Sequence, residues 1–315
     1  MRKSSLLMFL MVGLVAIPAS AGDDEEGGWF IAIEATSLQP TGGLEDYALL
    51  DPDDSNSQPQ GTIQSVDYDY EMAPRIHFGH TAGNGGRWSF SWWEYDEDTT
   101  DSVSATSPSN LWDILYHADE SFDDYEGTAD ALGAYEASLM DLTYSRPLTS
   151  SDRFHTRWSI GVRRAELDHG LAVLYDDTFS VETVLLASEA EGTGFSGGLN
   201  GMYMLNDKWF VTGGTTYSFM VGELESLTFQ EDSVDGIDAD ITAERDANFS
   251  IFEAKCAIAW HPTNSLYLWA GYEFSQWNNV VERNLFPDDV NEGFIQNDIS
   301  SVTWDGFTFG AAFTF

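Results

Sequence analysis

Hydrophobic and polar residues alternate along the end of the chain. Between Phe307 and Phe315 four of the five odd positions are phenylalanine, and the even positions hold small or polar residues. Side chains of a strand point alternately to its two faces, so this segment predicts a strand with one aromatic face. The same period recurs upstream, and we expect about ten strands, at 28–38, 64–79, 87–98, 134–147, 154–168, 192–205, 208–222, 248–262, 265–279 and 303–315.

The length of these segments separates a membrane barrel from a soluble sandwich, which alternates in the same way. Each segment has about 10 to 15 residues, whereas soluble strands usually have about five or six. Tilted strands of about ten residues cross a bilayer, and aromatic residues such as Trp29, Trp88 and Trp260 stand at segment ends, as interfacial girdles require. The expected fold class is therefore all-β, a transmembrane antiparallel up-and-down β-barrel.

The connections alternate between short turns and stretches of about 23 to 35 residues, which is the asymmetry of short periplasmic turns and long extracellular loops. The segment 165–191 has two hydrophobic runs around Asp176 and Asp177, and it predicts a hairpin that extends the fifth and sixth strands beyond the membrane. If this hairpin were itself inserted in the membrane, the barrel would have twelve strands.

The first residues predict a cleaved signal peptide at 1–21. Arg2 and Lys3 precede an apolar run of about twelve residues, which is too short for a membrane-spanning helix of about twenty, and Ala19-Ser20-Ala21 provides a cleavage site. We expect one domain at 22–315. No later stretch is apolar enough for a transmembrane helix.

Composition excludes several partners. The 315 residues include 53 acidic and 13 basic side chains, with a formal charge of −40. Nucleic acid and anionic lipid head groups bind basic surfaces, so neither is expected here. With a single cysteine, Cys256, the chain has no intrachain disulfide and no thiolate metal cluster.

Charge follows the same division as the connections. More than half of the acidic residues fall in the five long connections, with Arg245 and Arg283 as their only Lys or Arg residues. Strand parity places a mixed set of charged residues on the inner face, and we predict that they line the lumen in paired form. These are Glu34, Arg75, His77, Arg157, Arg163, Glu253, Lys255 and Glu273.

Several segments resemble the Legionella-type major outer-membrane porin family. They include the opening strand at 28–35, the segments 67–70 and 74–79 before a Gly-rich turn, the strand at 158–163, the glycine-rich 194–203 and the closing 307–315. The resemblance covers most of the mature chain and implies a pore-forming protein of the cell outer membrane. Phe313 and Phe315 resemble the C-terminal signal by which outer-membrane proteins are recognised by the barrel assembly machinery.

The acid-rich loops have two interpretations. They bind Ca²⁺ or Mg²⁺ and bridge to lipopolysaccharide, or they form a solvated acidic surface suited to a saline medium. The stretch 111–116 either anchors its own loop or forms a short helix that constricts the lumen. Metal binding stays open, and no cofactor is expected.

Three function classes remain. The leading prediction is a porin whose acidic mouth favours cations, with outer-membrane lipid, lipopolysaccharide and the assembly machinery as partners and oligomers left open. The alternative is a surface-structural or adhesin-like barrel with a blocked lumen. An outer-membrane protease-like enzyme is less expected, although Asp168-His169 and Asp119 near His117 place carboxylates beside histidines. We therefore predict no enzyme activity and no catalytic residues.

Overall fold

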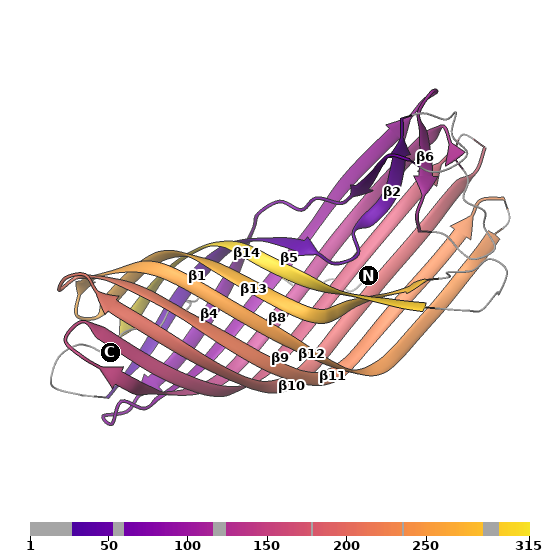
Figure 1. The fold of residues 1–315 in the computed structure, drawn as a ribbon. Helices are drawn as coiled ribbons and strands as arrows, with labels where there is room; N and C mark the ends of the chain where they lie inside the picture. Colours follow the sequence, from indigo (N-terminus) through magenta and orange to yellow (C-terminus); the bar gives the residue numbers. More distant parts are fainter. Residues whose placement is uncertain (1–26, 53–59, 116–123, 178, 235, 286–295) are drawn as a thin grey trace.

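The computed structural model describes residues 27–52, 60–115, 124–177, 179–234, 236–285 and 296–315. Ten antiparallel strands form a ring in which β1 is bonded to both β14 and β4 and so closes the barrel. The ring confirms the predicted fold class and strand number (Figure 1). Its strands are β1 (Gly28–Gly42), β4 (Glu71–Thr81), β5 (Arg87–Ala105), β8 (Gly127–Ser150), β9 (Phe154–Asp176), β10 (Val181–Met204), β11 (Trp209–Asp232), β12 (Gly236–Thr263), β13 (Leu266–Leu285) and β14 (Gln296–Thr314).

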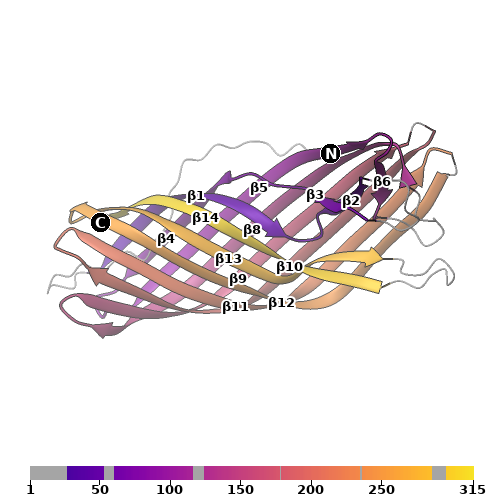
Figure 2. The ribbon, with the colours of Figure 1, turned by 45° about the horizontal axis from the view of Figure 1, so that its top comes forward.

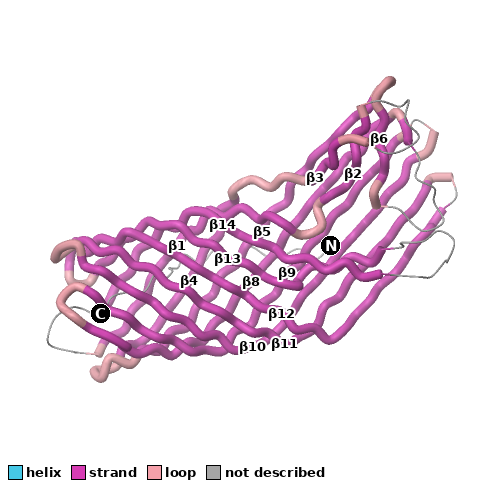
Figure 3. Tube along the Cα trace, in the orientation of Figure 1, coloured by secondary structure: helices cyan, strands magenta, loops and turns pink. Residues whose placement is uncertain are grey.

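Six neighbouring strands continue far beyond the length that a bilayer needs. Strands β5 and β8 to β12 have 19 to 28 residues, against about ten for a tilted transmembrane strand. Three connections predicted as long acidic loops are therefore largely strand, a correction that Figure 3 makes visible. We call the part of these six strands outside the membrane the extended wall.

The hairpin predicted at 165–191 is present. Strand β9 ends at Asp176 and β10 begins at Val181, so the turn lies at the two aspartates. Both strands are members of the ring and contribute one crossing each, so the twelve-strand alternative is wrong.

A second, smaller sheet lies at the outer end of the barrel. It consists of β2 (Asp46–Asp51), β3 (Thr62–Ser65), β6 (Asn110–Asp113) and β7 (Asp124–Tyr125), in the order β3-β2-β6-β7. Both views place β2 and β6 at the end of the molecule opposite the C-terminus (Figures 1 and 2). We call this sheet the plug sheet. Of the two alternatives for 111–116, the helix is wrong where the structure describes it, because residues 110–113 pair as a strand with β2.

The described outer ends of β13 and β14, up to Leu285 and from Gln296, turn into the barrel, and we call them the β13–β14 tip. The register of this pair shifts after Trp277, and Asn279 adopts a left-handed φ of 63° at the bend. Beyond it the Glu282 amide donates to Ser188 Oγ of β10 at 3.0 Å, and Asn284 Nδ2 donates to Ser226 Oγ of β11 at 3.1 Å. The β13–β14 tip therefore lies against the inner face of the opposite wall.

The part of the chain that the structure describes contains no helix long and apolar enough to cross a membrane. The predicted signal peptide at 1–21 lies outside the described residues.

Candidate functional site

The middle of the lumen holds a buried ion-pair network, which we call the lumen network. Arg75 of β4 contacts Glu34 of β1 at 2.8 Å and Glu273 of β13 at 2.7 Å. Lys255 of β12 lies 3.8 Å from Glu34. Glu34 is fully buried, and it also accepts a hydrogen bond from Thr308 at 2.7 Å. A charge buried in this way is tolerated because cations and hydrogen bonds surround it.

A second part of the lumen network joins β8, β9 and β12. Arg163 contacts Asp141 through two nitrogens, at 2.7 and 2.8 Å, and Glu253 at 2.5 Å. Sequence reasoning placed Arg163 and Glu253 correctly on the inner face but omitted Asp141. The signal was available, because Asp141 has the same strand parity as Leu139, away from the outward-facing Met140 and Leu142.

The other predicted lining residues lie inside the barrel in different roles. Arg157 donates from Nη2 to the carbonyl of Gly85 at 2.7 Å. It therefore stabilises a short turn, whereas the sequence predicted a pairing with a carboxylate. His77 is half-buried, and its buried Nε2 has no hydrogen-bond partner within the described structure. Arg87, which was not singled out, lies over the ring of Phe30 at 4.9 Å.

The outer half of the lumen is filled by a hydrophobic core. Trp93, Tyr95, Tyr135, Trp277 and Trp304 are at most 3% exposed, and Trp277 and Trp304 meet edge to face at 5.2 Å between ring centres. Residues of the plug sheet and of the inner faces of β8 to β12 belong to the same core. The core therefore extends from wall to wall.

A small hollow lies beside the lumen network. A hollow next to Lys255, bounded by Asn200, Thr212 and Thr308, measures about 10 Å³, roughly the room for one water molecule. Below it, Phe30, Tyr267 and Trp269 are buried in a second apolar cluster toward the periplasmic end. Packed layers thus occupy the described lumen at three successive levels.

Glu45 fastens the chain leading into the plug sheet to the barrel wall. Its carboxylate accepts from Tyr135 of β8 at 2.5 Å and from Tyr68 at 3.2 Å, and it lies 2.9 Å from His169 Nε2 of β9. Burial and the charge of Glu45 raise the pKa of Tyr135 well above its usual range, so this phenol stays a donor. A separate hydrogen bond from the Tyr175 hydroxyl of β9 to the carbonyl of Tyr47 holds β2 itself to the wall.

The paired Asp168 and His169 do not form one chemical site. They follow each other in β9, so their side chains point to opposite faces of the wall. Asp168 is exposed on the outside, and His169 is buried inside against Glu45. His117 and Asp119 lie outside the described residues.

The outer face of the extended wall carries eleven acidic side chains in two adjacent rows, which we call the carboxylate belt. Strand register places each member of the first row beside the next across six strands, and in the second row Ser138 of β8 separates Glu94 from Glu166. One row is Asp96, Glu136, Asp168, Glu189, Glu225 and Glu244, and the row nearer the membrane contains Glu94, Glu166, Glu191, Glu223 and Asp246.

Like charges on neighbouring strands repel one another. Partial desolvation, together with the charges of Glu189, Glu136 and Glu166, raises the pKa of Asp168 to about 6. Arg164 is the one basic side chain among the described outward residues of this wall, and it contacts Glu191 at 2.8 Å and also Glu166. The belt thus keeps a large excess of negative charge.

The apolar band below the belt faces outward. Ile160, Phe195, Val221 and Phe309 are 50 to 76% exposed there, which is expected for side chains in contact with lipid. Phe313 and Phe315 are also exposed and stack at 6.2 Å, where Trp29 and Phe315 exchange backbone hydrogen bonds. Cys256 is exposed in the same band.

One family model matches nearly the whole described barrel. It is the model for Legionella pneumophila major outer membrane protein precursor, and it matches residues 23–315. A search of curated proteins finds no match.

Solved structures of outer-membrane barrels are similar in fold. The outer membrane protease OmpT from Escherichia coli superposes with a TM-score of 0.53 at 10% identity, over 91% of this chain and 97% of that one. The Pseudomonas putida toluene transporter TodX (TM-score 0.27, 7% identity, 95% and 92% of the chains) and a Pseudomonas aeruginosa FadL homologue (0.23, 8%, 91% and 90%) are more distant. At these identities the likeness concerns the barrel fold alone.

Proposed function

The chain belongs to the Legionella major outer membrane protein family, and we propose that it is a closed outer-membrane barrel that acts through the surface of its extended wall. The cell outer membrane is its location, as the family and the barrel neighbours indicate. The observation that carries the proposal is the filled lumen: the outer core, the lumen network and the periplasmic apolar cluster follow one another along the axis. This is the blocked, surface-structural alternative considered from the sequence.

Pore formation is the second candidate. The inner faces of β10 and β11 are small and polar at mid-height, with Ser196, Gly214 and Thr216 near the lumen network. The β13–β14 tip that helps to fill the outer half is held partly by polar contacts, including Arg245 to Glu282 at 2.9 Å. Displacement of this tip and of the plug sheet would open a polar passage whose acidic mouth favours cations.

Conductance in a planar bilayer separates the two candidates. The purified wild-type barrel is expected to insert without steady current, while a porin of known conductance inserted in the same membrane reports that the assay works. Steady conductance whose reversal potential indicates a preference for cations would support the pore and contradict the closed barrel. This preference should weaken as the salt concentration is raised.

Further parts of the proposal concern partners and chemistry. Outer-membrane lipid and lipopolysaccharide surround the apolar band, the barrel assembly machinery reads Phe313 and Phe315, and no enzyme activity is expected, since Asp168 and His169 lie on opposite faces. Truncation of the last three residues is expected to reduce the amount of assembled barrel in cells, measured by gel mobility before and after boiling.

A further inference from the structure

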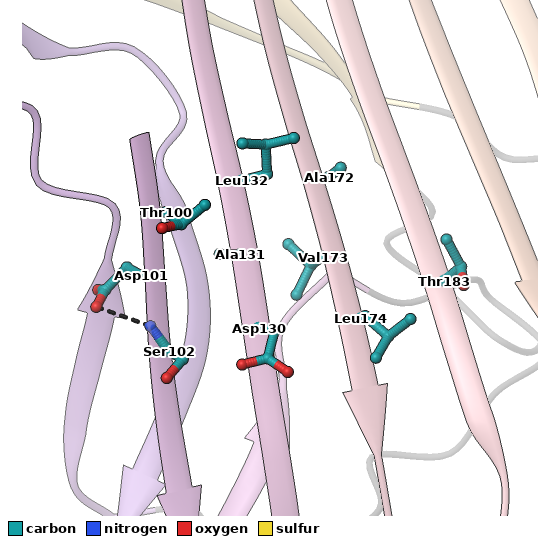
Figure 4. Close-up of a pocket in the computed structure, with 10 residues that line it drawn as sticks. All are labelled: Thr100, Asp101, Ser102, Asp130, Ala131, Leu132, Ala172, Val173, Leu174 and Thr183. Atoms are coloured by element: carbon teal, nitrogen blue, oxygen red, sulfur yellow. Dashed lines mark hydrogen bonds between the residues drawn. The ribbon is translucent and has the colours of Figure 1, made fainter. Parts of the chain in front are cut away.

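A shallow apolar hollow lies on the outside of the extended wall, beyond the carboxylate belt. It has a volume of about 640 Å³ and spans β5, β8, β9 and β10 (Figure 4). Leu132, Ala172 and Leu174 form its apolar part, and Thr100 and Thr183 stand at its two sides. We call it the wall hollow.

The apolar surface continues sideways from the wall hollow. Leu132 pairs with Ala172, Ala172 with Leu185, and Leu185 with Phe229, so four apolar side chains form one outward row across β8 to β11. Leu132, Leu174 and Leu185 are 38 to 44% exposed. An exposed apolar row of this length on a wall in water is typical of an interaction surface.

Lipid does not cover this row. Along β9 the apolar band ends at Val162, the belt residues Glu166 and Asp168 follow, and Leu174 comes last, on the side away from the membrane. The belt therefore separates the wall hollow from the band that faces lipid.

The wall behind the hollow is fixed in place. Ala131 and Val173 form the floor of the hollow, and their side chains are buried in the inner core together with Tyr47 and Leu111 of the plug sheet. The surface is thus formed before any partner binds, so less conformational entropy is lost when a partner associates with it.

Charge selects the partner. The row is bordered by the belt on one side and by Asp130, Glu231 and Asp240 on the others, and Arg164 is already paired. A second copy of this chain would bring its own belt, and lipopolysaccharide phosphates are anionic, so both are repelled. A partner with an apolar stripe beside a basic stripe complements the surface in both respects.

Size suggests a helix. Six strands about 4.8 Å apart span about 24 Å across the wall. An α-helix of about 16 residues has this length.

We propose that the wall hollow and the adjoining carboxylate belt bind a cationic amphipathic helix of a partner protein or peptide, with its apolar face on Leu132, Leu174 and Leu185 and its Lys or Arg side chains on the belt. This inference builds on the proposed surface function, but its binding readout does not depend on whether the barrel conducts.

The test uses the intact barrel in detergent and a fluorescent Lys/Leu helix of about 16 residues. Anisotropy titrations compare wild type with Leu132→Ser/Leu174→Ser, and with the matched control Ile299→Ser, an exposed apolar residue on β14 away from the hollow. The double variant is expected to raise the Kd about tenfold, since two half-buried leucine contacts are lost, and the control to leave it unchanged.

A second pair of variants tests the belt. Glu136→Gln/Glu189→Gln is expected to weaken binding and to flatten its salt dependence, whereas Asp152→Asn/Asp207→Asn at the periplasmic turns is not. Gel mobility before and after boiling reports that each variant is folded.

Three results would overturn the inference. A scrambled peptide of equal charge that binds as tightly would show attraction to the acidic chain in general. Unchanged binding by the folded leucine variant would remove the hollow from the site. Concentration-dependent dimers of wild type that Leu132→Ser/Leu174→Ser abolishes would assign the surface to a second copy.

Discussion

The membrane half and the extended half of this barrel have opposite interiors. In the membrane half, charged residues such as Arg75, Glu34 and Arg163 are inside and aromatic residues face outward. In the extended half the interior is a hydrophobic core and the outside is the carboxylate belt. The same six strands reverse their pattern where the surroundings change from lipid to water, so the solvent outside the wall decides which residues can be placed inside.

The largest effect is expected from breaking the charged interior of the membrane half. Arg75→Met leaves Glu34 and Glu273 buried without their main cation, which should lower the free energy of unfolding by about 3 to 5 kcal/mol. Denaturant unfolding in detergent, followed by tryptophan fluorescence, measures it.

The matched control neutralises the whole group. Arg75→Met combined with Glu34→Gln and Glu273→Gln removes the uncompensated charges, and most of the lost stability should return. A triple variant as unstable as the single one would show that packing and not charge sets the cost.

The apolar interior of the extended half is tested by Leu111→Ala in β6. Leu111 is fully buried, so a loss of about 2 to 4 kcal/mol is expected, confined to the extended half. Hydrogen exchange should speed up in β2 and β6 and stay slow in β1 and β14. Equal acceleration in both halves would contradict their independence.

A smaller effect is expected in the carboxylate belt. The pKa of Asp168 is raised to about 6 from 3.8, so the folded protein takes up this proton more readily than the unfolded chain, and the ionised carboxylate is destabilising above that pH. Asp168→Asn should therefore stabilise the extended half at pH 7.5, by less than about 1 kcal/mol. The gain should fade as the pH decreases through about 6, because the wild-type group is then protonated.

Asp152→Asn, at a periplasmic turn far from the belt, provides the control for the loss of one carboxylate elsewhere on the barrel. A gain that grew toward low pH would reverse the assigned sign.

The smallest effect is expected at Arg164. Its pairs with Glu166 and Glu191 are about half exposed, so Arg164→Gln should change stability by about 0 to 1 kcal/mol. A loss as large as that of Arg75→Met would show that the belt depends on this single cation.

Strand alternation predicted the ten barrel strands and the charged interior of the membrane half, but not the hydrophobic core of the extended half. It placed Arg75, Glu34 and Glu273 on one face, since parity is a local property of the chain. It could not show that Arg157 binds the turn at Gly85, because that contact joins residues far apart in sequence.

The extended wall was harder to predict. Six of its outward acids were assigned to long connections, namely Glu189, Glu191, Glu223, Glu225, Glu244 and Asp246, and their alternation with buried residues such as Ala190 and Leu224 was not used. The belt itself depends on register across six strands, which a single sequence does not contain.

Access to the lumen tests the closed barrel most directly. In a Cys256→Ala background, Thr216→Cys puts a thiol on the inner face at mid-height, and Thr100→Cys puts one on the outer wall. A membrane-impermeant maleimide added outside intact cells should label position 100 rapidly and position 216 only after the barrel is unfolded. Rapid labelling of both would show that water and small solutes reach the lumen, and that the barrel is open.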